Sequence, residues 1–141
     1  MLWIYYCFIT KIKAMSTTAT KVMTTKEIAK KLKKYCEHGE FETAQKELFA
    51  KDAISIEPMA GGGFDKETKG LDAIIKKGEK WNNMVTATHS MEISEPMIAG
   101  NTFSLTMRMD VTTKDRGRMD MTELCVYQVK DGKIISEQFY M

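Results

Sequence analysis

Three polar side chains near the carboxyl end of the chain have the chemistry needed for proton transfer. Glu123, Gln138 and Tyr140 fall on strands expected to be neighbours, at positions otherwise filled by apolar residues. Burial disfavours the charged form of a carboxyl group, so a buried Glu123 could act as a general acid or base near neutral pH. Tyr140 could then donate a hydrogen bond to a developing oxyanion, and Gln138 could orient the substrate. The alternative is a structural carboxyl group that only bonds to Tyr140.

Three further residues are candidates for the same site. His89 lies in a predicted strand, and a bulge near Glu95 and Pro96 would turn it toward a pocket, whereas without the bulge it points outward. Glu57 precedes a glycine-rich loop, which is a natural place for the mouth of a pocket. Trp81 is spaced to face inward from a helix. Glu57 and Trp81 could instead simply cap or pack.

Composition limits the classes of function. The chain has 141 residues, with 21 Lys and Arg against 19 Asp and Glu, and a formal net charge of +2. This length fits one domain, and the near-neutral balance argues against nucleic acid as a partner. A membrane partner is not expected either, because the sequence has no apolar run of about 20 residues. Two histidines and three scattered cysteines predict neither a metal site nor a cofactor.

Residues 1–23 are predicted to lie outside the folded domain, which spans residues 24–141. Residues 1–9 are almost wholly apolar, but lysines follow this run instead of preceding it, unlike in a signal peptide. The segment could be a translated extension upstream of a functional start at Met15, a degenerate export signal or a short apolar arm. The polar, Thr-rich residues 16–21 favour the first interpretation, which implies a cytoplasmic protein.

Three helices are predicted before residue 85. Thr24 and Glu27 have the spacing of a capping box, and the helix that they begin should end at Gly39. A second, short helix is expected over residues 41–49. Apolar residues at helical spacing then predict a third helix over residues 71–82.

Alternating apolar and polar residues predict that most of the remaining chain is sheet. Strands are expected over residues 54–57, 85–99, 102–113, 118–129 and 133–141. Gly100-Asn101 and Asp131-Gly132 have the composition of two-residue hairpin turns, the second of type I′. Helices followed by a meander of strands indicate an α+β domain.

The two hairpins also predict which residues face each other. Closing Asp131-Gly132 as a two-residue turn pairs Tyr127 with Ser136, Cys125 with Gln138 and Glu123 with Tyr140. In the preceding hairpin, a loop near Thr113 pairs Met109 with Met119, Met107 with Met121 and Leu105 with Glu123. That register places Arg108 opposite Asp120 and Asp110 opposite Arg118 on the other face, where opposite charges stabilise neighbouring strands. A slip of one residue would reverse the faces.

The two sheet faces therefore have different predicted roles. The inner face lines the predicted pocket around Glu123, together with Trp81 from the third helix and Glu57 at the mouth. The ligand-binding set comprises Gln138, Trp81, Glu57, Phe103, Met107, Met121 and Tyr127. The catalytic set comprises Glu123, Tyr140 and His89. The outer face carries an apolar strip, which indicates a homodimer interface formed by Leu124, Val126, Ile135 and Phe139.

Three segments resemble a known superfamily. They are LFAKDAISIEP, GLDAIIKKGEKW and MDMTELCVYQVKDGKIISEQFYM. Residues 24–141 resemble the nuclear-transport-factor-2-like superfamily, and within it the SnoaL-like polyketide cyclase group. The resemblance implies a cone-shaped, curled antiparallel sheet with three N-terminal helices packed on its concave face, an internal pocket and a dimer. The superfamily contains isomerases, dehydratases, epoxide hydrolases and noncatalytic modules, so fold alone does not settle function.

The predicted function is binding of an apolar carbonyl compound, with cofactor-free isomerase or cyclase chemistry in which Glu123 moves a proton. The alternative is a noncatalytic module for ligand binding or dimerisation, and a protein adaptor is a third possibility. An epoxide hydrolase would become the better interpretation if the predicted register were wrong by one residue. That error would bring Arg108, Asp110, Arg118 and Asp120 into the pocket.

Overall fold

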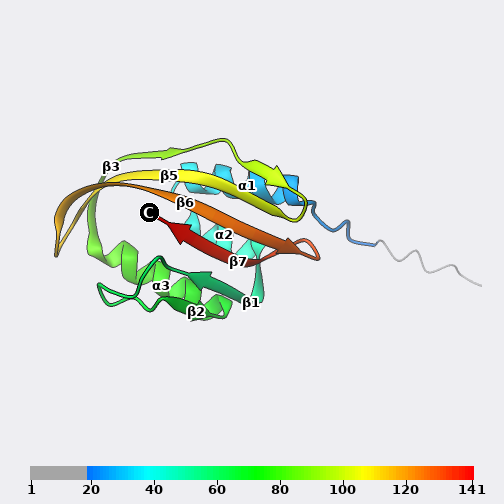
Figure 1. Ribbon diagram of the computed structural model, residues 1–141, viewed down its shortest axis with the longest axis horizontal. Helices are drawn as coiled ribbons and strands as arrows, with labels where there is room; N and C mark the ends of the chain where they lie inside the picture. The colour runs from blue at the N-terminus through cyan, green and yellow to red at the C-terminus, as the bar shows by residue number, and fades with distance from the viewer. Residues whose placement is uncertain (1–18) are drawn as a thin grey trace, which may run out of the picture.

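The computed structural model describes residues 19–141, and the predicted features of residues 1–18 lie outside the described residues. The elements are α1 (Thr25–Glu37), α2 (Phe41–Leu48), β1 (Phe49–Ile56), β2 (Glu67–Lys69), α3 (Leu71–Met84), β3 (Val85–Ile93), β4 (Met97–Ala99), β5 (Thr102–Thr113), β6 (Gly117–Lys130) and β7 (Lys133–Tyr140). The strands form a curved sheet, and the helices lie against one of its faces (Figure 1). The predicted α+β fold is confirmed.

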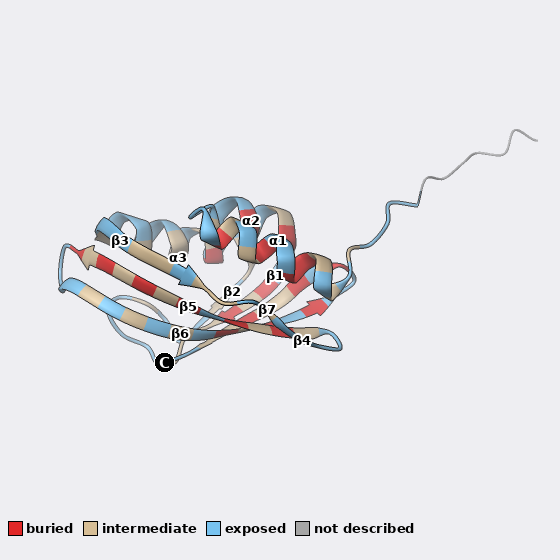
Figure 2. Ribbon diagram, turned by 90° about the horizontal axis from the view of Figure 1, so that it is seen from above, coloured by how far each residue is buried: buried red, intermediate tan, exposed pale blue. Residues whose placement is uncertain are grey.

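Helix α1 begins and ends where its sequence predicts. The Thr24 hydroxyl accepts a hydrogen bond from the Glu27 backbone N–H at 3.2 Å, and the Glu27 carboxylate accepts one from the Thr24 N–H at 2.8 Å. Gly39 follows the helix with φ 69°, a conformation that suits glycine. The buried face of α1 consists of Ile28, Ala29, Leu32 and Cys36. Figure 2 shows buried residues on the helices and on the strands that they cover.

The strand order in the sheet is β2-β1-β7-β6-β5-β3, with β4 paired to β5. All pairs are antiparallel except β1 with β7, which is parallel, so the sheet is mixed and mostly antiparallel. The predicted strand 85–99 is divided into β3 and β4. The dividing segment contains Pro96, which has no N–H for a ladder, and Ser94, whose hydroxyl accepts a hydrogen bond from the Thr106 N–H at 2.8 Å.

Both predicted two-residue turns are confirmed. Ala99 pairs with Thr102 across Gly100-Asn101, and Lys130 pairs with Lys133 across Asp131-Gly132. Asp131 has φ 50° and Gly132 has φ 75°, and type I′ requires positive φ at both positions. The turn chemistry therefore determines where these hairpins reverse.

The predicted pairing of β6 with β7 is right at the turn and wrong beyond it. Val129 pairs with Ile134, but Gln128 pairs with Ser136, so Ile135 is the extra residue of a bulge. One extra residue sends every later side chain of β7 to the opposite face. The observed pairs are Tyr127 with Glu137, Cys125 with Phe139, Val126 with Gln138 and Leu124 with Tyr140. Glu137 and Phe139 consequently face inward, and Gln138 and Tyr140 face outward.

The predicted pairing of β5 with β6 is wrong by two residues. Met109 pairs with Met121 instead of Met119, because the hairpin closes with Thr113 opposite Gly117. An even shift leaves each side chain on its predicted face, so the methionines still face the helices. The predicted ion pairs also form, as diagonal neighbours: Arg108 with Asp120 at 2.7 Å, and Arg118 with Asp110 at 2.8 Å.

Candidate functional site

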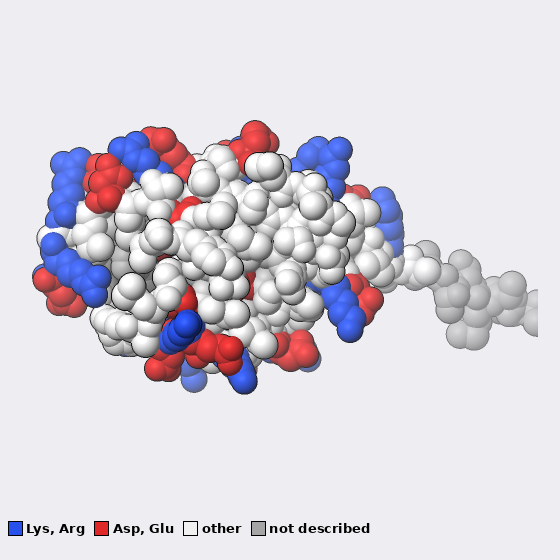
Figure 3. All heavy atoms as spheres, in the orientation of Figure 1, with Lys and Arg blue, Asp and Glu red and all other residues white. Residues whose placement is uncertain are grey.

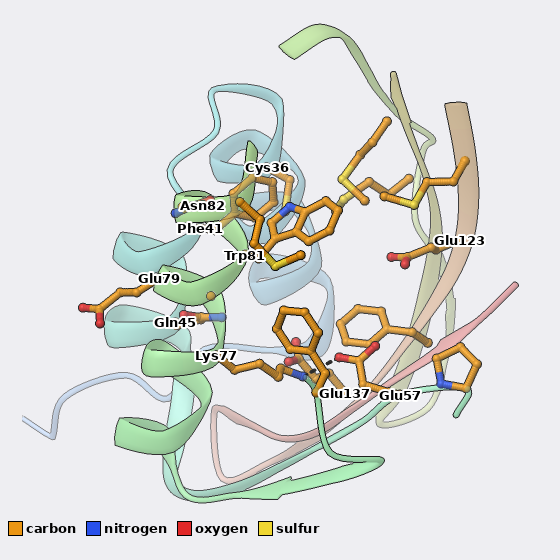
Figure 4. A pocket seen from close by; sticks show the side chains of 18 of the residues that line it. Cys36, Phe41, Gln45, Glu57, Lys77, Glu79, Trp81, Asn82, Glu123 and Glu137 are labelled. Atoms are coloured by element: carbon orange, nitrogen blue, oxygen red, sulfur yellow. Dashed lines mark hydrogen bonds and ion pairs between the residues drawn. The ribbon is translucent and has the colours of Figure 1, made fainter. Parts of the chain in front are cut away.

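A cavity of about 460 Å³ lies between the curled sheet and the three helices. Strands β5 and β6 line it with the side chains of Met107, Met109, Met119 and Met121. Helices α2 and α3 contribute Phe41 and Trp81, and β7 contributes Phe139. Figure 4 shows side chains from both layers converging on this space. Aromatic rings and flexible thioethers form walls suited to an apolar ligand.

A polar cluster occupies one side of the cavity. Lys77 of α3 forms an ion pair with Glu57, the residue that follows β1, with the Lys77 Nζ and Glu57 Oε1 atoms 2.6 Å apart. Lys77 Nζ also donates to Ser55 Oγ, and the Ser55 hydroxyl donates to Glu137 Oε1 at 2.6 Å. The side chains of Lys77 and Glu57 are only 14% and 22% exposed. The cluster thus connects one cation to two carboxyl groups in a largely desolvated place (Figure 4).

Glu123 lies apart from this cluster, on β6. Its carboxyl group points into the cavity (Figure 4) and makes no hydrogen bond or ion pair with any described residue. Burial and, to a smaller extent, the negative charge of Glu57 raise the pKa of Glu123 to about 7, against the opposing effect of Lys77. Near neutral pH, therefore, this carboxyl group can both accept and donate a proton.

Glu137 is the most buried acid of the site, with 5% of its surface exposed. Burial raises its pKa, while the hydrogen bond from Ser55 and the charge of Lys77 lower it. The Ser55 hydroxyl therefore fills a hydrogen-bonding position of the Glu137 carboxyl group, whereas the Glu123 carboxyl group keeps its hydrogen-bonding capacity for a ligand.

Most of the predicted pocket residues do line the cavity. They are Glu123, Glu57, Trp81, Met107, Met121 and Tyr127. Phe103 is buried in the core instead, behind the cavity wall, where its ring stacks on Tyr127 with centroids 4.9 Å apart.

The structure places three predicted site residues outside the cavity. Gln138 and Tyr140 face outward because of the bulge at Ile135, and Tyr140 is 47% exposed. His89 is exposed and its ring lies 2.8 Å from the Thr112 hydroxyl. The strand is interrupted near Glu95 as expected, but a further irregularity in the pairing with β5 falls at His89 itself, between Thr88 and Ser90, and His89 stays outside the cavity. None of the three can contact a ligand in the cavity.

Sequence reasoning missed Lys77 and Glu137. Lys77 precedes Trp81 by four residues and therefore shares its helix face, so the pattern of α3 carried a signal for it. Glu137 had no such signal, since only the bulge brings it inside.

The charged residues of an epoxide hydrolase arrangement also lie outside the cavity. Arg108, Asp110, Arg118 and Asp120 pair with one another on the outer face of the sheet. Across residues 19–141, no three His, Cys, Asp or Glu side chains are grouped as metal ligands would be. No helix among these residues has the length and apolar character needed to cross a membrane.

The outer face of the sheet carries part of the predicted apolar strip. Leu124 is 41% exposed there, with Val126 beside it on β6. Phe139 does not belong to this face, because the bulge turns it into the cavity, and Tyr140 takes its place. Figure 3 shows one face of the molecule, on which charged side chains gather along the margin and the middle is largely uncharged.

Comparison with known proteins gives consistent matches. The sequence model of the SnoaL-like domain family matches residues 23–141. A presumed SnoaL-like polyketide cyclase from Mesorhizobium loti is 33% identical, with a TM-score of 0.78, over 84% of this chain and all of that one. No curated protein is detectably similar.

Two other solved structures share the fold at lower identity. A presumed isomerase from Bacillus subtilis is 18% identical, with a TM-score of 0.62, over 84% of this chain and 88% of that one. A protein with a ketosteroid isomerase-like fold from Catenulispora acidiphila, solved in complex with trimethylamine, is also 18% identical. Its TM-score is 0.65, over 84% of this chain and 87% of that one.

Proposed function

The chain belongs to the SnoaL-like family, and from this premise we propose that it binds an apolar carbonyl compound and moves a proton on it. The reaction would be an isomerisation or an aldol-type cyclisation without a cofactor. The observation that carries the proposal is the Glu123 carboxyl group, which faces a cavity walled largely by methionines and aromatic rings, has no partner among residues 19–141, and has a pKa raised to about 7. Such a group suits general acid-base catalysis at neutral pH.

The neighbouring residues support complementary roles. In its ionised form, Glu123 would accept a proton from the carbon next to the carbonyl group and return it elsewhere on the product. The Lys77 ammonium would stabilise the enolate oxygen electrostatically, in place of the hydroxyl expected from Tyr140. Trp81 and the methionines of β5 and β6 would exclude water from the reacting carbon.

The test is hydrogen exchange on model ketones. Protein in D₂O is incubated with 2-tetralone or 3-cyclohexen-1-one, and deuterium uptake or double-bond migration is followed by NMR. Glu123→Gln should slow the reaction about 100-fold or more, since general acid-base groups contribute on that scale. Glu67→Gln, the same change on exposed β2, is the matched control and should retain the wild-type rate.

A noncatalytic binding module is the alternative outcome of that test. It would bind the ketones, as shown by quenching of tryptophan fluorescence, without accelerating exchange above the Glu123→Gln rate. That result would remove the proposed enzyme activity and leave the cavity as a ligand site.

We also propose that the protein forms a homodimer through the outer sheet face. The exposed apolar groups of Leu124 and Tyr140 support this interface. Analytical ultracentrifugation should give twice the chain mass for the wild type and for Ala73→Lys on the exposed side of α3, and a monomer for Leu124→Lys. A monomeric wild type would contradict the proposal.

A further inference from the structure

We propose that the ligand of the cavity carries a cationic nitrogen on its apolar body, with the Glu123 carboxylate as its counter-charge. The inference deepens the proposed function, because it narrows the ligand class of the same site. It rests on the charges and the wall chemistry of the cavity.

The lining of the cavity is acidic. The described lining residues include five acids, Glu42, Glu57, Glu79, Glu123 and Glu137, against two bases, Lys77 and Arg116. Figure 4 shows Glu79 directed away from the cavity, whereas Glu123 points into it. Glu42 is half exposed and pairs with Lys46 at the surface. The acids that remain are Glu57, Glu123 and Glu137, of which only Glu57 has an ion pair with a base of the lining, and a cationic ligand would supply one for Glu123.

The one lysine of the lining is already engaged. Lys77 Nζ lies 2.6 Å from Glu57 and donates to Ser55, which in turn bonds to Glu137. These contacts hold Lys77 within the polar cluster, and no ion pair links it to Glu123. Glu123 is thus the carboxyl group left for a ligand, and its neighbours on the paired strand are apolar, including Met107 directly opposite.

The walls of the cavity suit a cation with apolar substituents. The Lys77 ammonium lies over the Phe139 ring, 5.4 Å from its centroid, so this ring already accepts a cation on its face. Phe41, Trp81 and Tyr127 add aromatic groups to the same lining. Aromatic faces together with one carboxylate form the kind of site that recognises alkylated ammonium groups.

Binding of such a ligand would be linked to the ionisation of Glu123. The charged groups that act on Glu123 are Glu57, which follows β1, Lys77 of α3 and Glu137 of β7. Because the pKa of Glu123 is about 7, both its protonated and its ionised form are present in the free protein near neutral pH. A cation favours the carboxylate, so its affinity rises with pH through about 7 and then levels off. The bound cation would also hold Glu123 in the form that accepts a proton.

The test uses two probes that differ in charge but not in shape: phenyltrimethylammonium and tert-butylbenzene. The ammonium probe is permanently charged, so any dependence of its affinity on pH belongs to the protein. We expect it to bind at least about tenfold more tightly than tert-butylbenzene above pH 7, and to lose about tenfold in affinity for each pH unit below 7. Isothermal titration calorimetry measures both probes.

Glu123→Gln identifies the counter-charge. It should abolish the preference for the ammonium probe and its pH dependence, while tert-butylbenzene still binds, which shows that the cavity is intact. Glu67→Gln should behave as the wild type. Equal or tighter binding of tert-butylbenzene at every pH, failure of both probes to bind, or a preference that survives in Glu123→Gln would each overturn the inference.

These outcomes are distinguishable from failure of the proposed function. Exchange on 2-tetralone without any preference for the ammonium probe would overturn the inference and leave the proton-transfer proposal standing. A preference for the ammonium probe that depends on Glu123, without hydrogen exchange on 2-tetralone, would support the inference and overturn the proton-transfer proposal.

Discussion

Acidic residues on the two faces of strands β5 and β6 have different partners and opposite pKa shifts. On the outer face, Asp120 and Asp110 each bond to an arginine, at 2.7 Å and 2.8 Å, and these arginines lower the pKa of both aspartates. On the inner face, Glu123 has no such partner among the described residues, and burial raises its pKa to about 7. The same strands therefore hold surface acids that stay ionised and an interior acid that can exchange its proton at neutral pH.

This difference shows how position decides the role of a carboxyl group. Both outer acids are paired with arginines, and Asp120 is also solvated, with 49% of its side chain exposed, so its charge contributes little and does no chemistry. The inner acid has lost water without gaining a cation, which destabilises its ionised form and leaves it reactive. The lysine that would neutralise it is held by Glu57 instead.

The largest effect on stability should come from breaking the inner ion pair. Lys77→Met leaves Glu57 without its cation in a largely buried place, and removal of one partner from such a pair costs about 3 to 5 kcal/mol of the free energy of unfolding. Urea unfolding at neutral pH measures it. Lys76→Met, next to it but exposed, is the control and should change stability little. Equal losses of stability in the two variants would show that the Lys77–Glu57 ion pair contributes no more than an exposed lysine does.

The same variant should also change the titration of Glu123. In Lys77→Met the pKa of Glu123 should rise, because the positive charge of Lys77 lowers it in the wild type.

A comparable effect should appear in the pH dependence of stability. The folded pKa of Glu123 lies above the ordinary value of 4.5, so its contribution to stability is present below pH 4.5 and is lost as pH rises through about 7. The stability of Glu123→Gln relative to wild type should therefore increase by up to about 3 kcal/mol between about pH 4 and about pH 8. Glu137 is present in both proteins and cancels in the difference. If the free energy of unfolding changed with pH in the same way for Glu123→Gln and the wild type, the unpaired state of Glu123 would be contradicted.

The smallest effect should come from the outer pairs. Arg118→Gln removes the partner of Asp110, and solvent already screens this pair because the Arg118 side chain is 65% exposed, although that of Asp110 is only 14% exposed. The midpoint of thermal unfolding should move by about 2 °C or less. A shift as large as that of Lys77→Met would mean that the two faces do not differ as described.

Much of this fold could be predicted from local signals. The capping box at Thr24 and the Asp131-Gly132 turn are short patterns whose geometry depends on neighbouring residues only, and both are confirmed. The inward position of Glu123 was also predictable, because the register error between β5 and β6 is an even number and leaves the faces unchanged.

The part of the site on β7 could not be predicted from the sequence. Alternating apolar and polar residues predict which side chains of a strand share a face. They do not predict the bulge at Ile135, which moves all later side chains of β7 to the opposite face. This single residue removes Tyr140 and Gln138 from the expected site and brings in Glu137 and Phe139. Lys77 was predictable in principle, since it shares a helix face with Trp81, but a charged residue in an apolar stripe resembles an ordinary solvent-facing position.

The central claim is that Glu123 exchanges its proton near neutral pH, and direct titration of its carboxyl carbon tests it. Protein labelled with ¹³C at glutamate side chains is titrated by NMR, and the Glu123 resonance is assigned by its absence from Glu123→Gln. We predict a midpoint of about 7 for this resonance. A Glu123 midpoint near 4.5 would contradict the account, because the carboxyl group would then be an ordinary ionised acid at neutral pH.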